Sequence, residues 1–388
     1  MDKLLVLPGS CDVLGGTVIS LSLLIMGFEQ HRQLHKIQVL VRTNSILEQY
    51  LKQSNQKICL QSIDAHNQKQ FFERALIWVG KQPKRYPLLL DNCVFNYLLP
   101  KLLVAAPNLR TSGRQVYHFC HDTAASGNFL GYVARKLIFS CLAPRVLCNS
   151  HFTASEVRHL MPNIFGVLYQ PVDARRFNRT PLSIPPISLE TILRSGSRIM
   201  LTPSRISKAG IKNDKNLRTL IPILAVLKAR GYNYCSIIIG EDSSLNQINS
   251  CDLLIQAKLM DVADRFFILP PSKDIENYYK FADIVVTLAP REPFGRTVVE
   301  AVACGVPVVG SRTGGIGEIL SHFAPEWMVS PDDPIGAAEA IIRVTTDPNT
   351  STLLMQAQCW VEKECSVEDY AKKIMKYTNI DSNSAVNI

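Results

Sequence analysis

The chain has 388 residues, more than one compact core usually holds, so we expect two domains. Its apolar fraction of 47% and charged fraction of 19% are typical of a folded globular protein and exclude a disordered one. The eleven cysteines form no C-x-x-C pair and no cysteine–histidine spacing of a zinc site, which favours free thiols in a reducing compartment over metal binding.

The net charge of +9 is unevenly distributed along the chain. Residues 1–194 hold 22 Lys and Arg against 11 Asp and Glu, a net charge of +11, whereas the remaining residues carry −2. A basic first half could attract anionic lipid headgroups or a phosphorylated acceptor, or it could be a solvated face without a partner. No nucleic-acid-binding module appears in the sequence, so we expect no nucleic-acid partner.

Two apolar stretches bear on localisation. The stretch from Met1 to Phe28 is interrupted by Pro8 and Asp12, and no small-residue cleavage site of a secretory signal follows it. The stretch from Leu130 to Cys148 contains Arg135 and Arg145 and is too broken for a membrane span. We therefore expect a cytoplasmic protein. Any association with a membrane would be peripheral, at its inner face.

The first elements in chain order alternate between strand and helix. Leu4 to Leu7 is an apolar strand, Gly15-Gly16-Thr17 opens a helix that runs to about Gln30, and Ile37 to Val41 is the next strand. This β–loop–α–β order begins a doubly wound parallel sheet. Further strands of this half are expected at Leu88–Leu90, Gln115–Phe119, Arg145–Cys148 and Gly166–Leu168.

The second half repeats the α/β pattern after a proline- and serine-rich segment. Strands are expected at Ile199–Thr202, Ser236–Gly240, Arg265–Leu269 and Ile284–Leu288. We predict an α/β protein with an N-terminal domain at 1–180, a linker at 181–197, a second domain at 198–365, and a C-terminal helix and tail at 366–388 that packs back toward the first domain. Two doubly wound Rossmann-like domains of this kind would face a central cleft.

The stretch from Thr287 to Leu320, TLAPREPFGRTVVEAVACGVPVVGSRTGGIGEIL, carries the most informative pattern. A turn through Pro293 and Gly295 joins a buried strand to a short helix, which directs backbone N–H groups and the positive end of the helix dipole toward one point. Glu292 and Glu300 lie in the loop and the helix, and a carboxylate that accepts two hydroxyl hydrogen bonds is suited to a ribose or sugar diol. Taken alone, two such glutamates are more often a solvated helix residue and a loop charge, and the flanking sequence is what favours a binding role.

This stretch resembles the donor-site motif of the retaining, family-four GT-B glycosyltransferases, the glycogen-synthase-like glycosyl transferases group 1. The resemblance runs through E-P-F-G at Glu292 to Gly295, the second glutamate Glu300, the run Ala301–Val309, and G-G-x-x-E at Gly314 to Glu318. It extends along nearly the whole chain. Earlier segments similar to the family's are Gly15-Gly16-Thr17, His118–Asp122, Asn149-Ser150, Gln170–Asp173 and Ser204-Arg205-Ile206.

The resemblance implies roles for individual residues. Arg205 and Lys215 would neutralise the donor's diphosphate, helped by Gly15 and Gly16, although Lys208 and Lys212 compete with Lys215 because its distance from Arg205 exceeds the family's usual spacing. His121 would lie beside the transferred sugar, while His118 is expected to be buried and structural. Within the motif, the resemblance assigns sugar hydroxyls to Glu292, backbone N–H contacts to Phe294 and Gly295, ribose to Glu300, and further donor contacts to Arg296 and Thr297.

The implied activity is a retaining hexosyl transfer that needs no metal and no cofactor. The donor would be a UDP-, GDP- or ADP-sugar, and the acceptor a hydroxyl of a glycan, a lipid-linked molecule or a small molecule. Two alternatives share the architecture: a sugar-nucleotide 2-epimerase, against which the E-P-F-G motif speaks, and a non-catalytic relative that binds nucleotide sugar. An anionic membrane surface is a further expected partner of the basic first half.

Overall fold

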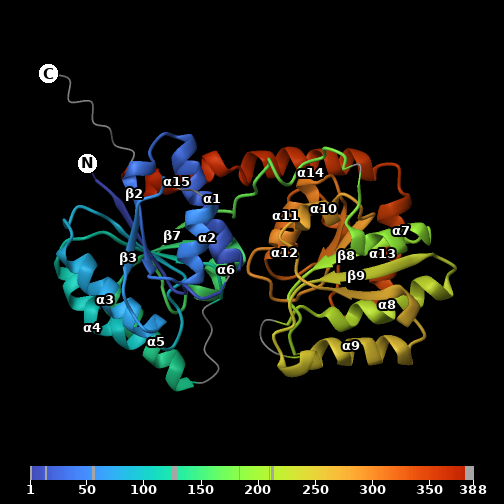
Figure 1. The fold of residues 1–388 in the computed structure, drawn as a ribbon, viewed down its shortest axis with the longest axis horizontal. Helices are drawn as coiled ribbons and strands as arrows, with labels where there is room; N and C mark the ends of the chain where they lie inside the picture. The colour runs from blue at the N-terminus through green and yellow to red at the C-terminus, as the bar shows by residue number, and fades with distance from the viewer. Residues whose placement is uncertain are drawn as a thin grey trace. The chain divides into compact units, whose positions relative to one another are not determined.

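The computed structural model describes residues 2–13, 15–54, 57–123, 129–182, 184–208, 210 and 214–380. The chain divides into two compact units, one made of Met1–Pro171 with Cys365–Ile388, the other of Val172–Glu364. Each unit has its own parallel sheet with helices on both faces (Figure 1). The predicted GT-B class, with two Rossmann-like domains, is confirmed in this respect.

Within the described residues, the first unit's sheet has seven strands, and each strand runs parallel to its neighbours. The chain first builds the sheet outward from β1 in one direction and then crosses back to the other side of β1, so the order reverses between β1 and β4. The strands, in their order across the sheet, are β3 (Leu60–Ile63), β2 (Ile37–Arg42), β1 (Leu4–Pro8), β4 (Leu88–Asp91), β5 (Val116–Cys120), β6 (Arg145–Cys148) and β7 (Ile164–Val167).

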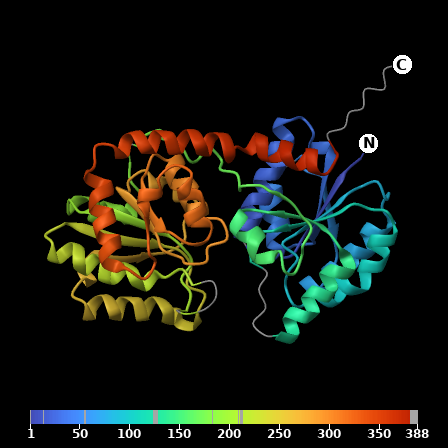
Figure 2. The same ribbon diagram turned by 180° about the vertical axis from the view of Figure 1, so that it is seen from behind.

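The central strands of this sheet are buried throughout and mostly apolar because helices cover both of their sides. In Figures 1 and 2, α3, α4 and α5 lie on one side of the sheet, and α1 and α15 lie on the other. The helices of the unit are α1 (Gly16–Gln30), α2 (Ile46–Ser54), α3 (Gln68–Lys81), α4 (Leu99–Thr111), α5 (Phe129–Leu142), α6 (His151–Val157) and α15 (Val367–Tyr377).

The C-terminal helix α15 is part of the first unit and packs against α1. A Cβ on Gly27 would come within 2.4 Å of the Ala371 Cβ, so the glycine permits this close packing of the two helices. The Tyr117 hydroxyl donates to the Tyr377 carbonyl at 2.6 Å, and the Lys36 ammonium donates to the Ile380 carbonyl at 3.1 Å. The end of the described chain is therefore fixed to the first sheet.

The second unit repeats the architecture with six parallel strands in the part that the structure describes. Its strand order reverses between β8 and β11, which are direct neighbours with Val285 opposite Leu201. The strands, again in order across the sheet, are β10 (Phe266–Leu269), β9 (Tyr234–Ile239), β8 (Arg198–Pro203), β11 (Ile284–Thr287), β12 (Val308–Ser311) and β13 (Met328–Val329).

The helices of the second unit also form two layers. On one side of the sheet lie α8, α9 and α13, and on the other α10, α11, α12 and α14 (Figure 1). The bounds of these helices are α7 (Glu190–Arg194), α8 (Leu220–Ala229), α9 (Ile248–Leu259), α10 (Ile275–Tyr279), α11 (Arg296–Ala303), α12 (Gly314–Ser321), α13 (Pro334–Thr346) and α14 (Thr350–Glu364).

The boundary between the units falls at Pro171–Val172, earlier than the expected linker at 181–197. That segment contains a short 3-10 turn (Ile187–Leu189) followed by α7. Prolines precede this turn and helix, but both elements belong to the second unit and pack onto it. Leu189 and Ile192 are therefore buried.

No helix in the described part of the chain combines the length and the apolar character that crossing a membrane would require.

Candidate functional site

The second unit places charged residues where its strand order reverses. Arg205 follows the end of β8, and Glu292 lies in the loop that follows the neighbouring strand β11. Ligands of doubly wound sheets bind outside the carboxyl ends of the strands at such a reversal point. The two residues therefore lie at the expected ligand-binding edge of the sheet.

Lys215 forms an ion pair with Glu292, and both side chains are about three-quarters buried. The next residue, Asn216, adopts a left-handed conformation with φ of 55° and donates to the Pro331 carbonyl at 2.7 Å, which fixes the end of this loop. Of the competing lysines, Lys208 is exposed and Lys212 lies outside the described residues. The structure thus brings Lys215, of the three candidate lysines, to Glu292.

Arg205 is exposed, and among the described residues none forms a hydrogen bond or ion pair with its guanidinium. Its backbone is tightly positioned, because a Cβ on Gly240 would come within 1.9 Å of the Ser204 carbonyl oxygen. The segment after β9 can therefore lie against Ser204 and Arg205 only with glycine at position 240. A fixed backbone with a solvent-facing guanidinium suits an anionic ligand.

The loop after β11 is held by the start of α12. The Gly315 N–H donates to the Glu292 carbonyl at 2.7 Å, and a Cβ on Gly315 would come within 2.5 Å of the Phe294 backbone. Phe294 is buried, and Gly295 has φ of 99° as it leads into α11. Gly295 offers no side-chain cap, so the helix begins at Arg296 and Thr297 with N–H groups directed out of its first turn.

Glu300 lies in the middle of α11 and is only 7% exposed. The Tyr279 hydroxyl donates to Glu300 Oε2 at 3.1 Å, and Arg296 Nη1 lies 3.9 Å from Oε1. Burial raises the pKa of the Glu300 carboxyl, while Arg296 and the Tyr279 hydrogen bond act in the opposite direction. The carboxyl is thus a buried acceptor and not a solvated helix charge.

In the first unit, His121 follows β5 and is buried in a hydrogen-bond network. Its Nε2 lies 2.8 Å from Asp91 Oδ1 at the end of β4, and its Nδ1 lies 3.0 Å from Gln170 Nε2. An amide N–H donates, so Nδ1 accepts from Gln170 and Nε2 carries the proton given to Asp91. The Asn149 amide donates to the His121 carbonyl at 3.2 Å.

Both ring nitrogens of His121 are therefore engaged by protein groups in this conformation. The residue joins the ends of β4 and β5 to the segment after β7. Asp91 is a member of this network that the sequence did not single out, whereas Gln170 begins a segment that resembles the family's. Gly15 and Gly16 begin α1 at the same, carboxyl-end edge of the first sheet, where a Cβ on Gly15 would meet no atom within 4 Å.

His118 is fully buried, as predicted. Its Nδ1 lies 3.2 Å from the Cys120 sulfur, and its ring packs edge-on against Phe139 with centroids 5.4 Å apart. Burial lowers the pKa of His118 from 6.5 to about 3, so the ring is neutral. This histidine belongs to the core.

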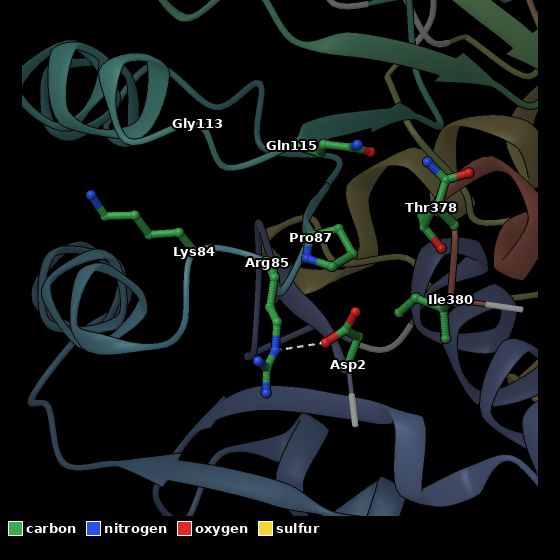
Figure 3. A pocket seen from close by; sticks show the side chains of 9 residues that line it. Asp2, Lys84, Arg85, Pro87, Gly113, Gln115, Thr378 and Ile380 are labelled. Carbon is green, nitrogen blue, oxygen red and sulfur yellow. Dashed lines mark ion pairs between the residues drawn. The ribbon is translucent and has the colours of Figure 1, made fainter. Parts of the chain in front are cut away.

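Figure 3 shows a polar pocket in the first unit, with Asp2, Arg85 and Gln115 in its lining. Pro87 and Gln115, which line it, precede β4 and β5, whereas His121 follows β5 at the opposite edge of the sheet. Arg85 and Asp2 in its lining form an ion pair at 2.8 Å. The pocket is no part of the candidate site.

Residues 194–359 match the family model of the glycosyl transferases group 1. N-acetyl-alpha-D-glucosaminyl L-malate synthase of Bacillus anthracis is 31% identical over 25% of this chain and 26% of its own length. A D-inositol 3-phosphate glycosyltransferase of Saccharomonospora viridis is 27% identical over 55% of this chain and 50% of its own length. The chain thus spans half or less of the length of these curated relatives.

Solved structures resemble the chain over nearly its full length. HepE of Anabaena, crystallised with UDP, has a TM-score of 0.77 at 19% identity and covers 97% of this chain and 100% of its own. Sucrose-phosphate synthase of Thermosynechococcus elongatus has a TM-score of 0.72 at 17% identity and covers 97% and 98%. At such identities the likeness shows the fold, which is GT-B. The part of the chain that matches the glycosyl transferases group 1 model, residues 194–359, carries the E-P-F-G motif after β11, next to the reversal point of the second sheet.

Proposed function

We propose that this protein is a glycosyltransferase that moves a hexosyl group from a nucleotide-diphosphate sugar to an acceptor hydroxyl with retention of anomeric configuration. The observation that carries the proposal is the arrangement at the carboxyl edge of the second sheet. There Arg205 and Lys215 follow β8, Lys215 pairs with Glu292 in the loop after the neighbouring strand β11, and that loop leads into α11 with the buried Glu300. All of them lie in the part of the chain that matches the group 1 model. UDP is the first donor nucleotide to test because HepE was crystallised with UDP and with UDP-glucose.

Arg205 and Lys215 act on the leaving group in this proposal. The diphosphate gains negative charge as its bond to the sugar breaks, and a fixed guanidinium and ammonium stabilise that charge in the transition state. Lys215 is now paired with Glu292, so the incoming diphosphate and the glutamate would share its ammonium protons. Glu292 in turn accepts hydrogen bonds from the sugar hydroxyls.

The transfer step breaks one bond and forms one bond on the same face of the sugar. The bond between the anomeric carbon and the diphosphate oxygen breaks, and the acceptor oxygen bonds to that carbon. The acceptor's proton passes to the leaving diphosphate, so no separate protein base is required. In this proposal His121 is not the nucleophile. It holds Asp91 and Gln170 in place through its two ring nitrogens.

Incubation with UDP-, GDP- and ADP-sugars tests the proposal against its two alternatives. A glycosyltransferase gives acceptor-dependent transfer, a 2-epimerase gives an epimerised donor without acceptor, and a non-catalytic relative binds without turnover. We expect transfer with the anomeric configuration retained, as read by NMR of the product, and activity that survives EDTA because Arg205 and Lys215 carry the phosphate charge. Loss on chelation that only magnesium or manganese restores contradicts the metal-independent part of the proposal.

We also propose that the first unit docks reversibly on an anionic bilayer. Helix α5 exposes a row of apolar side chains, with Phe129 and Leu130 about four-fifths exposed and Val133 and Leu137 about half exposed. Helix α4 packs against α5 and exposes Val104. Neither helix contains an acidic residue, and both carry basic ones, in a half of the chain with net charge +11. An apolar face bordered by cations is complementary to an anionic membrane surface.

A further inference from the structure

Tyr279 directs its hydroxyl into the buried surroundings of Glu300. Its side chain is fully buried, and the hydroxyl donates to Glu300 Oε2 at 3.1 Å. The other carboxylate oxygen, Oε1, is 3.9 Å from Arg296 Nη1, which is beyond hydrogen-bond distance. One oxygen of the carboxylate is therefore held by the protein, and the other keeps its lone pairs for a further donor.

Helix α10, which carries Tyr279, is only five residues long and is held in place by Arg176 and Phe177, which lie outside the helix. Arg176 donates to both carboxylate oxygens of Glu276 on this helix, at 2.9 and 2.6 Å, and also to the Lys273 carbonyl just before it. Phe177 packs edge-on against the Tyr279 ring with centroids 6.0 Å apart. The residues after the unit boundary thus fix the helix that orients Tyr279.

We propose that Tyr279 is the positioning residue for Glu300: it fixes one carboxylate oxygen so that the other faces the diol of a bound nucleotide. This inference rests on the proposed function, because it assigns the ribose to Glu300. Tyr279 does not touch the ligand in the proposal. It sets the rotamer and the charge of the residue that does, since a carboxylate whose position is fixed in advance loses less entropy on binding.

The electrostatics of the site agree with this division of roles. Burial and the charge of Glu300 raise the pKa of Tyr279 well above its usual value, so the hydroxyl remains a donor at any working pH. The Tyr279 hydrogen bond in turn favours the charged form of Glu300, against burial, which raises the pKa of that carboxyl. The charged or titratable groups that face this pair are Arg296, Arg176, Glu276 and Cys304.

Titration calorimetry with UDP, GDP and ADP on the full chain tests the proposal in the Tyr279→Phe variant. We expect about tenfold weaker binding of the preferred nucleotide, as when a hydrogen bond to a charged group is lost. We also expect a changed pH profile. Binding by the wild type weakens as the pH falls through the raised pKa of Glu300, and without the tyrosine donor this weakening begins at higher pH.

Two further variants distinguish positioning from general support. Tyr234 is also buried, and its hydroxyl bonds to Thr345 Oγ1 at 2.6 Å, so Tyr234→Phe is a matched control that should keep the wild-type pH profile. In a Glu300→Ala background, Tyr279→Phe should weaken binding no further, because Tyr279 acts only through Glu300.

The outcomes separate the inference from the proposed function. A wild type that binds none of the three nucleotides overturns both. A wild type that binds, together with a Tyr279→Phe variant of equal affinity and an identical pH profile, overturns the inference alone. If Tyr279→Phe loses affinity by the same factor at every pH and has a lowered thermal midpoint, Tyr279 is only a structural residue. This result also overturns the inference.

Discussion

Glu292 and Glu300 are close in sequence but have different surroundings, and this difference predicts different defects. Glu292 is partly exposed and paired with Lys215, whereas Glu300 is buried beside Tyr279. We expect Glu292→Ala mainly to lower kcat, by about 10- to 150-fold, because a charge-assisted contact of about 1.5–3 kcal/mol is lost in the transition state. Steady-state kinetics measures this, and unchanged kcat and KM would remove Glu292 from the site.

His118 predicts how stability depends on pH. Its folded pKa of about 3 lies below the usual 6.5, so the unfolded chain binds more protons between these values and stability falls as the pH is lowered through this window. Between pH 6.5 and 5 the slope from this group approaches about 1.4 kcal/mol per pH unit.

Urea unfolding of the wild type and of His118→Leu across that range provides the measurement. The variant should lose this part of the slope, whatever its absolute stability. Equal slopes in the two proteins would mean that His118 can take up its proton in the folded state.

The sequence singled out the candidate donor-site residues but not all of their partners. The E-P-F-G motif pointed to Glu292 and Glu300 because motif residues are local in the chain. Asp91 and Tyr279 were not singled out, since they meet their partners across 30 and 21 residues and nothing local marks them. Only the folded sheet order brings such residues together.

At the scale of elements, the loop that carries Glu292 depends on its fit to the start of α12. An alanine at Gly315 would place Cβ within 2.6 Å of three backbone atoms of Phe294, so the loop must shift. We expect Gly315→Ala to lower the free energy of unfolding by about 1–3 kcal/mol and to weaken nucleotide binding.

Gly80→Ala is the matched control for this prediction. Gly80 lies inside α3, and the nearest atom to its added Cβ is 3.9 Å away, so the change should stabilise the protein by about 0.5–1 kcal/mol. Urea denaturation compares the two variants. A Gly315→Ala protein as stable as the wild type would show that the contact is not needed.

Most buried strands were predictable from their apolar runs, whereas the edge strand β3 was not. Its sequence, LQSI, is only partly buried and has two polar residues between two apolar ones, so it lacks the continuous apolar signal of β1 or β4. The linker expected at 181–197 differs from the observed boundary at Pro171–Val172 for a related reason. Its prolines and serines dominate the composition, while Leu189 and Ile192 are the buried residues among those of this segment that the structure describes.

At the scale of the whole molecule, the charge asymmetry predicts salt-dependent membrane binding through the first unit. Each basic group near an anionic surface contributes about 1 kcal/mol, and salt screens it over about 8 Å at physiological ionic strength. We expect the protein to sediment with anionic vesicles at low salt and to be released at high salt.

A variant pair locates the surface. Leu130→Ser on α5 should reduce sedimentation, and Ile255→Ser, an exposed apolar residue on α9 of the other unit, should not. Equal sedimentation with neutral and anionic vesicles at low salt would end the membrane proposal. Equal losses in both variants would mean that the apolar contact is not specific to α5.

The central claim is that the carboxyl edge of the second sheet binds a nucleotide diphosphate through Glu300. Titration of the wild type and of Glu300→Ala with UDP, GDP and ADP tests this most directly. We expect the wild type to bind at least one of the three, and the folded variant to bind the same nucleotide more weakly by about 1.5–3 kcal/mol. A wild type that binds none of them, or a folded variant that binds as tightly as the wild type, would contradict the central claim.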